Sequence, residues 1–267
     1  MTTYTKLVGI INITPDSFAD SAGIHQTESA LQIAEGLISE GADILEIGAE
    51  STNPKSREIT LAEETARLSH VLPALMQQFP ETTFSLDTRR HEVARWFTTL
   101  GGTFVNDYRG LINDEMIPIV AESNCSYVVM HFPGQSLDEV HRHIPKIDSL
   151  DQVISELLAR KAYLVSYGIR ESQIILDPGI GFGKTPALNW RLLDVQSMLP
   201  NERVMIAFSK KRFLGEGRFS PEVNQRAGEI AITSGCEFLR VHNPAWFTEM
   251  RDAHAEKNTQ LPIEELP

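Results

Sequence analysis

Polar and charged side chains in this sequence gather directly after short apolar runs. The runs end in Asn12, in Glu50-Ser51-Thr52-Asn53, in Asp87, in Asn106-Asp107, in His131, in Asp177, in Ser209-Lys210-Lys211-Arg212 and in Arg240-Val241-His242-Asn243. A single aspartate at such a place is usually a turn residue or a helix cap. Polar groups after all eight runs are harder to explain by caps alone, and the set therefore predicts a functional site.

The residue types in this set separate into two chemical groups. The first group offers carboxylates and an amide, from Asp87, Asn106 and Asp177. Such groups suit a flat heterocycle that has N–H donors and a carbonyl acceptor. The second group is cationic or can become so, and consists of Lys211, Arg240 and His242. These side chains suit a phosphate or another anion, so a substrate with a heterocycle at one end and a phosphate at the other would use both groups.

The apolar runs themselves are typical of strands buried on both faces. They cover residues 7–12, 43–48, 82–87, 103–107, 126–131, 173–177, 203–208 and 236–241. Each is too short for a typical helix, and its near-continuous apolar character, without alternation, is what a strand of a parallel sheet shows.

Helical patterns fill the gaps between these strands. Residues 28–40 place apolar side chains on one face and are followed by a helix-ending glycine, Gly41. Residues 60–78 begin with Thr60 and Glu63, the spacing of a capping box. Similar patterns cover residues 148–167 and 221–234.

The alternation of strands and helices predicts parallel βα units and thus an α/β protein. Eight such units in about 250 residues predict a (β/α)8 TIM barrel, here as a single domain over residues 1–267. In a barrel, the carboxyl ends of all strands meet at one face, where ligands bind. A doubly wound open sheet remains the alternative, because the sequence does not show closure.

Composition excludes several other classes of protein. The 24 basic and 36 acidic residues give a net charge of −12, which disfavours a general nucleic-acid binder. No apolar run approaches the length of a membrane span. The first residues lack a signal-peptide pattern, and Cys125 and Cys236 form neither a disulfide framework nor a zinc pattern. We therefore expect a cytoplasmic protein.

Three further segments could carry function. In the segment from Asp177 to Lys184, three glycines in five positions would let the backbone approach a ligand, although the spacing is not that of a P-loop. The loop at residues 14–20 carries Phe18, which fits either a lid or an aromatic that packs down. His141-Arg142-His143 is expected to be a surface loop, because no metal-binding framework accompanies it.

Taken together, these segments resemble dihydropteroate synthase, of the pterin-binding (β/α)8 superfamily. The resemblance runs from Gly9 to Asn243, and its motifs cover residues 9–18, 41–52, 85–88, 105–107, 130–131, 177–184, 209–211 and 240–242. It implies condensation of 6-hydroxymethyl-7,8-dihydropterin pyrophosphate with p-aminobenzoate, which gives 7,8-dihydropteroate and pyrophosphate in folate biosynthesis.

The resemblance also implies roles for individual residues. The pterin pocket would comprise Asp87, Asn106, Asp177 and Lys211. The pyrophosphate site would comprise Asn12, Arg240 and His242, with Asn12 beside Mg²⁺. The p-aminobenzoate site would lie near Phe18, Thr52, Pro54, Phe182, Ser209 and Lys211. The family implies a homodimer through late helices, for which Trp246, Phe247 and Met250 would serve unless they cap the barrel.

These roles make chemical sense for a reaction in which pyrophosphate leaves the pterin methylene carbon. Arg240, His242 and Mg²⁺ would stabilise charge on the leaving group. Asp87 and Asp177 would offset the positive charge that develops on the ring, and Lys211 completes the pocket. The first two loops would close over the site and exclude water.

Departures from the family pattern are concentrated in the site. The second loop usually has an arginine where this chain has Asn53, and Lys55 or Arg57 is expected to replace it. An aspartate is usual at Glu46, and a glycine is usual ahead of Ser209, where Phe208 would crowd the ring pocket. The first loop reads Asp20-Ser21-Ala22-Gly23 in place of Asp-Gly-Gly.

Two interpretations follow from these departures. The chain is a divergent working synthase, or it is a paralogue that binds pterin but has lost the condensation or uses another amine. A sulfonamide would compete only if the pocket formed by Thr52, Pro54 and Phe182 exists.

Overall fold

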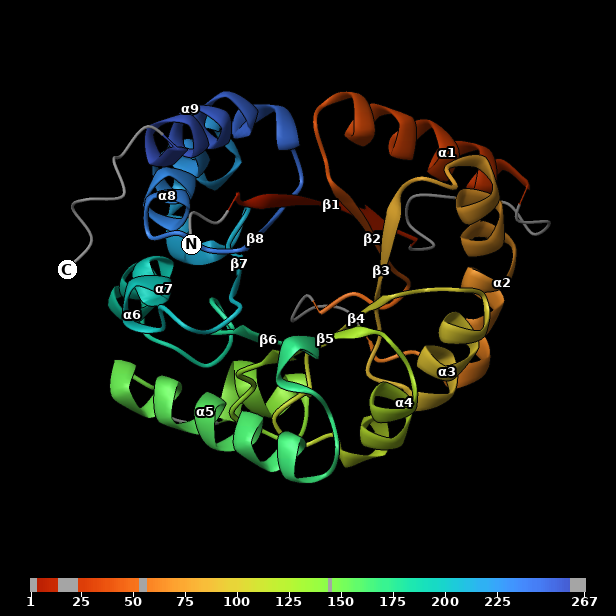
Figure 1. Ribbon diagram of the computed structural model, residues 1–267, viewed down its shortest axis with the longest axis horizontal. Coiled ribbons are helices and arrows are strands. Elements are labelled where there is room, and N and C mark those ends of the chain that lie inside the picture. Colours follow the sequence, from red (N-terminus) through yellow and green to blue (C-terminus); the bar gives the residue numbers. More distant parts are fainter. Residues whose placement is uncertain (1–3, 14–23, 53–56, 144–145, 260–267) are drawn as a thin grey trace.

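Eight parallel strands form one sheet in the computed structural model, which describes residues 4–13, 24–52, 57–143 and 146–259. Figure 1 shows the strands as an inner ring with helices around them. The strands are β1 (Lys6–Asn12), β2 (Ile44–Gly48), β3 (Thr83–Asp87), β4 (Phe104–Asp107), β5 (Ser126–Met130), β6 (Ile174–Asp177), β7 (Met205–Ala207) and β8 (Phe238–Val241). All eight predicted strands are therefore present, with shifted ends.

The sheet curls into a nearly closed barrel. Its strand order is β6-β5-β4-β3-β2-β1-β8-β7, so β6 and β7 are the two edges. A parallel bridge joins Leu176 of β6 to Val204, just before β7, and the Leu176 N–H donates to the Arg203 carbonyl at 2.8 Å. This bridge brings the two edges together, and the expected (β/α)8 barrel is confirmed against the open-sheet alternative.

The helices lie outside the ring. They are α1 (Ile24–Ser39), α2 (Leu61–Gln78), α3 (His91–Thr99), α4 (Ile117–Glu122), α5 (Leu150–Ser166), α6 (Pro186–Arg191), α7 (Val195–Met198), α8 (Pro221–Thr233) and α9 (Thr248–Thr259). The predicted capping box is present at α2, where Thr60 Oγ1 accepts from the Glu63 N–H at 3.2 Å. The Glu63 carboxylate in turn accepts from the Thr60 N–H at 2.8 Å.

The interior of the barrel changes from apolar to polar along its axis. Toward the amino ends of the strands, the interior is filled by a separate apolar cluster of inward-facing residues: Val8, Ile44, Phe104, Val128, Ile175, Met205 and Phe238. Side chains alternate between the two faces of a strand, so residues two positions further on also face inward. On four strands that next residue is polar: Glu46, Asn106, Asp177 and Arg240. Strand alternation therefore selects which polar residues meet inside the barrel.

Residues of the opposite alternation pack outward against the helices. Phe208 is completely buried and meets Phe247 edge to face, at 6.0 Å between ring centroids. The prediction that Phe208 crowds the ring pocket is therefore wrong. Phe247 is also completely buried and lies against Gly228 of α8, so it packs inside the subunit and is not available for a subunit interface.

The remaining expectations about the scaffold concern the cysteines and the membrane. Cys125 and Cys236 are free thiols, both buried, and burial raises the pKa of each. Across the described residues, the structure contains no helix with the length and apolar character needed to cross a membrane.

Candidate active site

Arg240 lies at the centre of a charged cluster inside the carboxyl end of the barrel. Its Nε donates to the Glu46 carboxylate, and its Nη2 donates to Asp87 Oδ2 at 3.0 Å. The Glu46 carboxylate also accepts from Ser85 Oγ at 3.0 Å and from Asn106 Nδ2 at 2.9 Å. The structure thus brings Asp87, Asn106 and Arg240 together, and it adds Glu46, to which the sequence analysis gave no role.

The charge state of this cluster follows from burial. Burial raises the pKa of Asp87 to about 7, the neighbouring Arg240 opposes this rise, and Glu46 adds to it. For Arg240, burial lowers the pKa, but Glu46 and Asp87 more than offset that effect and the pKa is raised. Arg240 is therefore charged, whereas Asp87 gains or loses its proton near neutral pH.

Space above Asp87 is kept open by Gly48. Gly48 pairs with Asp87 in the sheet and faces the same way. A Cβ added at Gly48 would lie 3.4 Å from the Asp87 Cβ, in contact with that side chain. Asn12, at the exposed end of β1, pairs with Gly48 on its other side, so the missing side chain leaves room between Asn12 and Asp87.

Asp177 and Lys211 form a second charged pair at the same end. Asp177 is almost fully buried, and its Oδ1 accepts from the Gly179 N–H at 2.7 Å. Burial raises the pKa of Asp177, and Lys211 opposes the rise. Burial lowers the pKa of Lys211 to about 8 against the effect of Asp177. The Lys211 Nζ donates to the Ile180 carbonyl at 2.7 Å and lies 5.0 Å from the centroid of the Phe182 ring.

The glycine-rich loop after β6 is tied down by Lys184, which sequence reasoning missed. The buried Lys184 ammonium donates to three carbonyls, those of His131 (3.2 Å), Gly179 (2.9 Å) and Phe182 (2.9 Å). Asn189 of α6 accepts from the Gly181 N–H at 2.7 Å. Lysine directly after the third glycine was the available signal, but its partners are backbone atoms that no spacing reveals.

One of the glycines serves protein packing rather than ligand approach. Gly179 has φ of +64°, and a Cβ there would lie 2.1 Å from the His131 carbonyl oxygen. Only glycine allows this contact. The predicted close approach of the glycine-rich backbone therefore occurs at Gly179, but its partner is the end of β5 rather than a ligand.

His242 and Ser209 lie together beside the cluster. The Nδ1 atom of His242 is 3.1 Å from Ser209 Oγ, and the His242 N–H donates to the same oxygen at 3.4 Å. Burial lowers the pKa of His242 to about 3, and Lys210, Arg240 and Lys211 add to that effect. His242 is therefore neutral at pH 7. The sequence grouped it with Arg240 and Lys211 as a possible cation, but only Arg240 and Lys211 carry positive charge.

A third group of residues comes from loops. His141 lies within a π-helical turn, η3 (Glu139–His143), and its Nε2 is 3.4 Å from the Thr52 carbonyl oxygen. The imidazole ring is 5.7 Å from the Phe182 ring, between centroids. The prediction of a plain surface loop at His141 is wrong, because this half-buried side chain joins the second loop to the glycine-rich loop.

Two polar residues of the predicted set face away from the site. His131 is fully buried, and its Nε2 lies 3.1 Å from Glu156 of α5; burial lowers its pKa to about 2. Asp107 accepts from Asn113 Nδ2 at 2.7 Å and from Tyr127 Oη at 3.0 Å, outside the barrel. Both have the outward alternation of their strands, which explains their placement.

The second loop is anchored at both described ends. Glu50 accepts from Arg89 Nε at 3.0 Å and from the Ile59 N–H at 2.9 Å. Arg57, expected as a replacement for the missing loop arginine, is instead paired with Glu63 at the start of α2. The remaining predicted loop residues lie outside the described part of the chain: Phe18, Ser21, Ala22, Asn53, Pro54 and Lys55.

Among the described residues, the donors near β1 fit Mg²⁺ rather than a metal held by protein side chains alone. Asn12 offers an exposed amide oxygen, a hard donor of the kind Mg²⁺ prefers. No group of three or more His, Cys, Asp or Glu side chains is placed to hold a metal among the described residues. Mg²⁺ typically keeps several waters and binds substrate phosphates through one or two protein oxygens, so this arrangement fits the ion.

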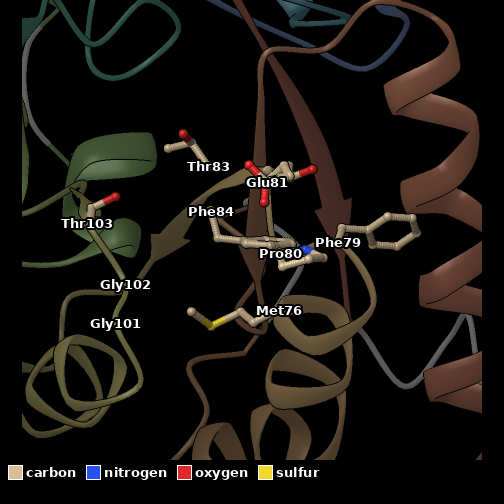
Figure 2. Close-up of a pocket in the computed structure, with 10 residues that line it drawn as sticks. Met76, Phe79, Pro80, Glu81, Thr83, Phe84, Gly101, Gly102 and Thr103 are labelled. Atoms are coloured by element: carbon tan, nitrogen blue, oxygen red, sulfur yellow. The ribbon is translucent and has the colours of Figure 1, made fainter.

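A hollow of about 260 Å³ lies at the opposite end of the barrel. Figure 2 shows it among the end of α2, the start of β3 and the turn before β4, with Met76, Phe84 and Gly102 in its lining. This is the amino end of the strands, where conserved features of a barrel concern stability rather than chemistry. The candidate active site is therefore the charged cluster at the carboxyl end.

Comparisons with known proteins agree with this assignment. Residues 8–242 match the model of a family described as pterin binding enzyme. The chain is 35% identical over 263 residues to a mitochondrial folate synthesis bifunctional protein of Arabidopsis thaliana, covering 90% of this chain but 47% of that protein. It thus spans about half the length of that relative. It is 32% identical over 256 residues to the type-3 dihydropteroate synthase of Escherichia coli, covering 90% and 94% of the two chains.

Solved structures give the same result. The Yersinia pestis dihydropteroate synthase in a sulfonamide complex has a TM-score of 0.85 at 28% identity, covering 96% of this chain and 95% of that one. The Xanthomonas albilineans dihydropteroate synthase with 4-aminobenzoic acid has a TM-score of 0.83 at 31% identity, covering 97% and 94%. With the barrel and its charged cluster, these matches show that the chain belongs to the pterin-binding enzyme family.

Proposed function

We propose that this chain is a dihydropteroate synthase, which condenses 6-hydroxymethyl-7,8-dihydropterin pyrophosphate with p-aminobenzoate to give 7,8-dihydropteroate and pyrophosphate. The observation that carries the proposal is that a carboxylate–amide set and two partly buried cations, Arg240 and Lys211, lie together at one end of the barrel. Relatives and solved structures with that name, at 28–32% identity over most of their length, support it.

The heterocycle is bound by Asp177, Asn106 and Lys211. The buried Asp177 carboxylate accepts from the N–H groups of the pterin, and the Lys211 ammonium donates to its carbonyl oxygen. Asp87 accepts from a further N–H group when it is ionised. Because these charges are fixed before the reaction, they stabilise the positive charge on the ring without reorganisation.

The leaving group is bound by Arg240 and His242. Arg240 is charged and donates N–H groups to phosphate oxygens, which stabilises the charge that grows there. His242 is neutral and its ring donates a single hydrogen bond. Asn12 would hold Mg²⁺, which supplies further neutralisation of the pyrophosphate when it is bound.

The amine acceptor enters beside Phe182. The aromatic ring of Phe182, with Lys211 at 5.0 Å and His141 at 5.7 Å, offers a flat wall for a benzoate ring. Thr52 lies on the second loop, next to His141. We also propose a cytoplasmic homodimer, because the family implies it and both cysteines are free thiols.

The test is release of pyrophosphate from the pterin substrate with Mg²⁺, measured with and without p-aminobenzoate. We expect release that depends on p-aminobenzoate, yields dihydropteroate, falls on chelation of Mg²⁺ and is inhibited by a sulfonamide. Pterin binding by calorimetry without any release would instead establish the paralogue that binds pterin and has lost the condensation.

A further inference from the structure

Glu46 is a completely buried carboxylate in the middle of β2. It receives donors from three other strands: Ser85 on β3, Asn106 on β4 and Arg240 on β8. A buried carboxylate is strongly destabilising unless it is paired and hydrogen-bonded. Glu46 therefore depends on Arg240, and it cannot release that cation without a large cost.

Arg240 has a second carboxylate partner of a different kind. Asp87 lies at the mouth of the site, and 19% of its side chain is exposed, against 0% for Glu46. Phosphate oxygens would compete for the same N–H groups of Arg240. Of the two carboxylates, Asp87 is the one that can exchange Arg240 for another partner, because solvent and substrate reach it.

We propose that Glu46 is a positioning residue that keeps Arg240 in place while Arg240 exchanges Asp87 for the leaving pyrophosphate. As the anion binds, the N–H groups of the pterin ring replace Arg240 as donors to Asp87, and these hydrogen bonds keep its carboxylate ionised. The two halves of the substrate site are then coupled, and each ligand strengthens the binding of the other. This inference rests on the proposed function and adds how its two subsites communicate.

The coupling is measured by calorimetry with two separate probes, uncharged 6-hydroxymethylpterin and inorganic pyrophosphate, at fixed Mg²⁺. We expect pyrophosphate to raise the affinity for the pterin by about fivefold or more, the lower range of measured couplings. Asp87→Asn removes the exchangeable partner and should abolish this enhancement. Independent binding of the two probes to the unmodified protein would overturn the proposal.

Glu46→Gln tests the positioning residue itself, because it keeps the shape and removes the charge. Arg240 is then less neutralised, so we expect pyrophosphate to bind several-fold more tightly. The pH at which pterin affinity falls on acidification (the acid limb of the affinity profile) should also move to a lower value. Ionised Asp87 binds the ring, so affinity rises as pH rises through about 7 in the unmodified protein, and Glu46 contributes to that high pKa.

The other charged groups that act electrostatically on Asp87 remain unchanged in this variant: Arg240, Glu64, Asp107 and Lys211. Glu46→Asp is the matched control, because it restores the charge and should return pyrophosphate affinity toward the original value. A purely structural role would weaken both probes in Glu46→Gln and leave the acid limb in place, which would contradict the proposal. Thermal unfolding of each variant verifies that it folds.

These readouts are independent of turnover. If p-aminobenzoate-dependent release is absent but the probes bind cooperatively, the proposed function fails and the role of Glu46 holds. If release is normal but the probes bind independently, the role of Glu46 fails and the proposed function holds.

Discussion

The two halves of the candidate site are built in different ways. The half to which we assign the pterin ring and the anion consists of strand residues, among them Glu46, Asn106 and Arg240, whose partners lie on other strands of the barrel. The half to which we assign the amine acceptor consists of loop residues, Thr52, His141 and Phe182. Strand alternation determines where the first set of side chains lies. The second set depends on other side chains that hold the loops in place.

Those fixing side chains differ from loop to loop. Lys184 and Asn189 hold the glycine-rich loop through backbone atoms. Glu50 and Arg89 hold the second loop by an ion pair. Under the proposed function, recognition of the heterocycle would rest on the barrel itself, whereas recognition of the amine would depend on a few side-chain contacts that can be removed one at a time.

The largest expected effect is in the strand half. Asp177→Asn removes a buried charge that would accept from the pterin N–H groups, each such bond being worth about 1.5–3 kcal/mol. We expect pterin affinity by calorimetry to fall about 100-fold. Asp107→Asn is the matched control, because that aspartate is equally buried but faces outward, and its pterin affinity should stay near the original value. Equal losses of pterin affinity in both variants would show that the inward or outward direction of a strand residue does not decide whether it binds the pterin.

A smaller effect is expected for the tie that holds the glycine-rich loop. Lys184→Met leaves three carbonyls without their donor, and an unsatisfied buried polar group costs about 1–3 kcal/mol. We expect a lower free energy of unfolding and a KM for p-aminobenzoate raised about tenfold, since Phe182 is no longer fixed. Steady-state kinetics and urea unfolding measure the two effects. Asn189→Ala, which removes a single tie, should change both in the same direction but less, and unchanged kinetics in Lys184→Met would show that the loop needs no such support.

The smallest effect is expected at the contact between two loops. His141→Ala removes a long hydrogen bond to Thr52 and a ring contact with Phe182. Since each is worth about 1 kcal/mol or less, the KM for p-aminobenzoate should rise only a few-fold, with the KM for the pterin substrate unchanged. His141→Phe keeps the ring contact and should recover part of the loss. An equal rise in both KM values would place His141 outside the acceptor half.

More of the scaffold than of the site could be predicted from the sequence. Runs of apolar residues and helical periodicity give the eight strands, the main helices and their order, because these are local properties. The inward or outward direction of each strand residue is not local. Asp107 and His131 follow strands just as Asp87 and Asp177 do, and only the closed barrel shows which of them face the axis.

The buried charges and the loop contacts could not be predicted from the sequence, because their partners are brought together only by the tertiary fold. Glu46 appeared there as a departure from a family pattern, although a lone charge two residues after an inward apolar residue was a usable signal. The partners of Lys184 are carbonyl oxygens, which every residue has, so no residue type identifies them. His141 reaches Thr52 across 89 positions of sequence, a contact that only the tertiary fold creates.

The apolar layer at the amino end of the barrel has a consequence for proton exchange. Val8, Phe104, Ile175 and Phe238 are almost completely buried beneath the charged cluster, so water reaches Asp87 from the carboxyl end alone. Under the proposed function, the bound pterin would cover that end. The proton on Asp87 would then be gained or lost before the substrate arrives, and each turnover would proceed with the protonation state that the free protein had when the ring entered.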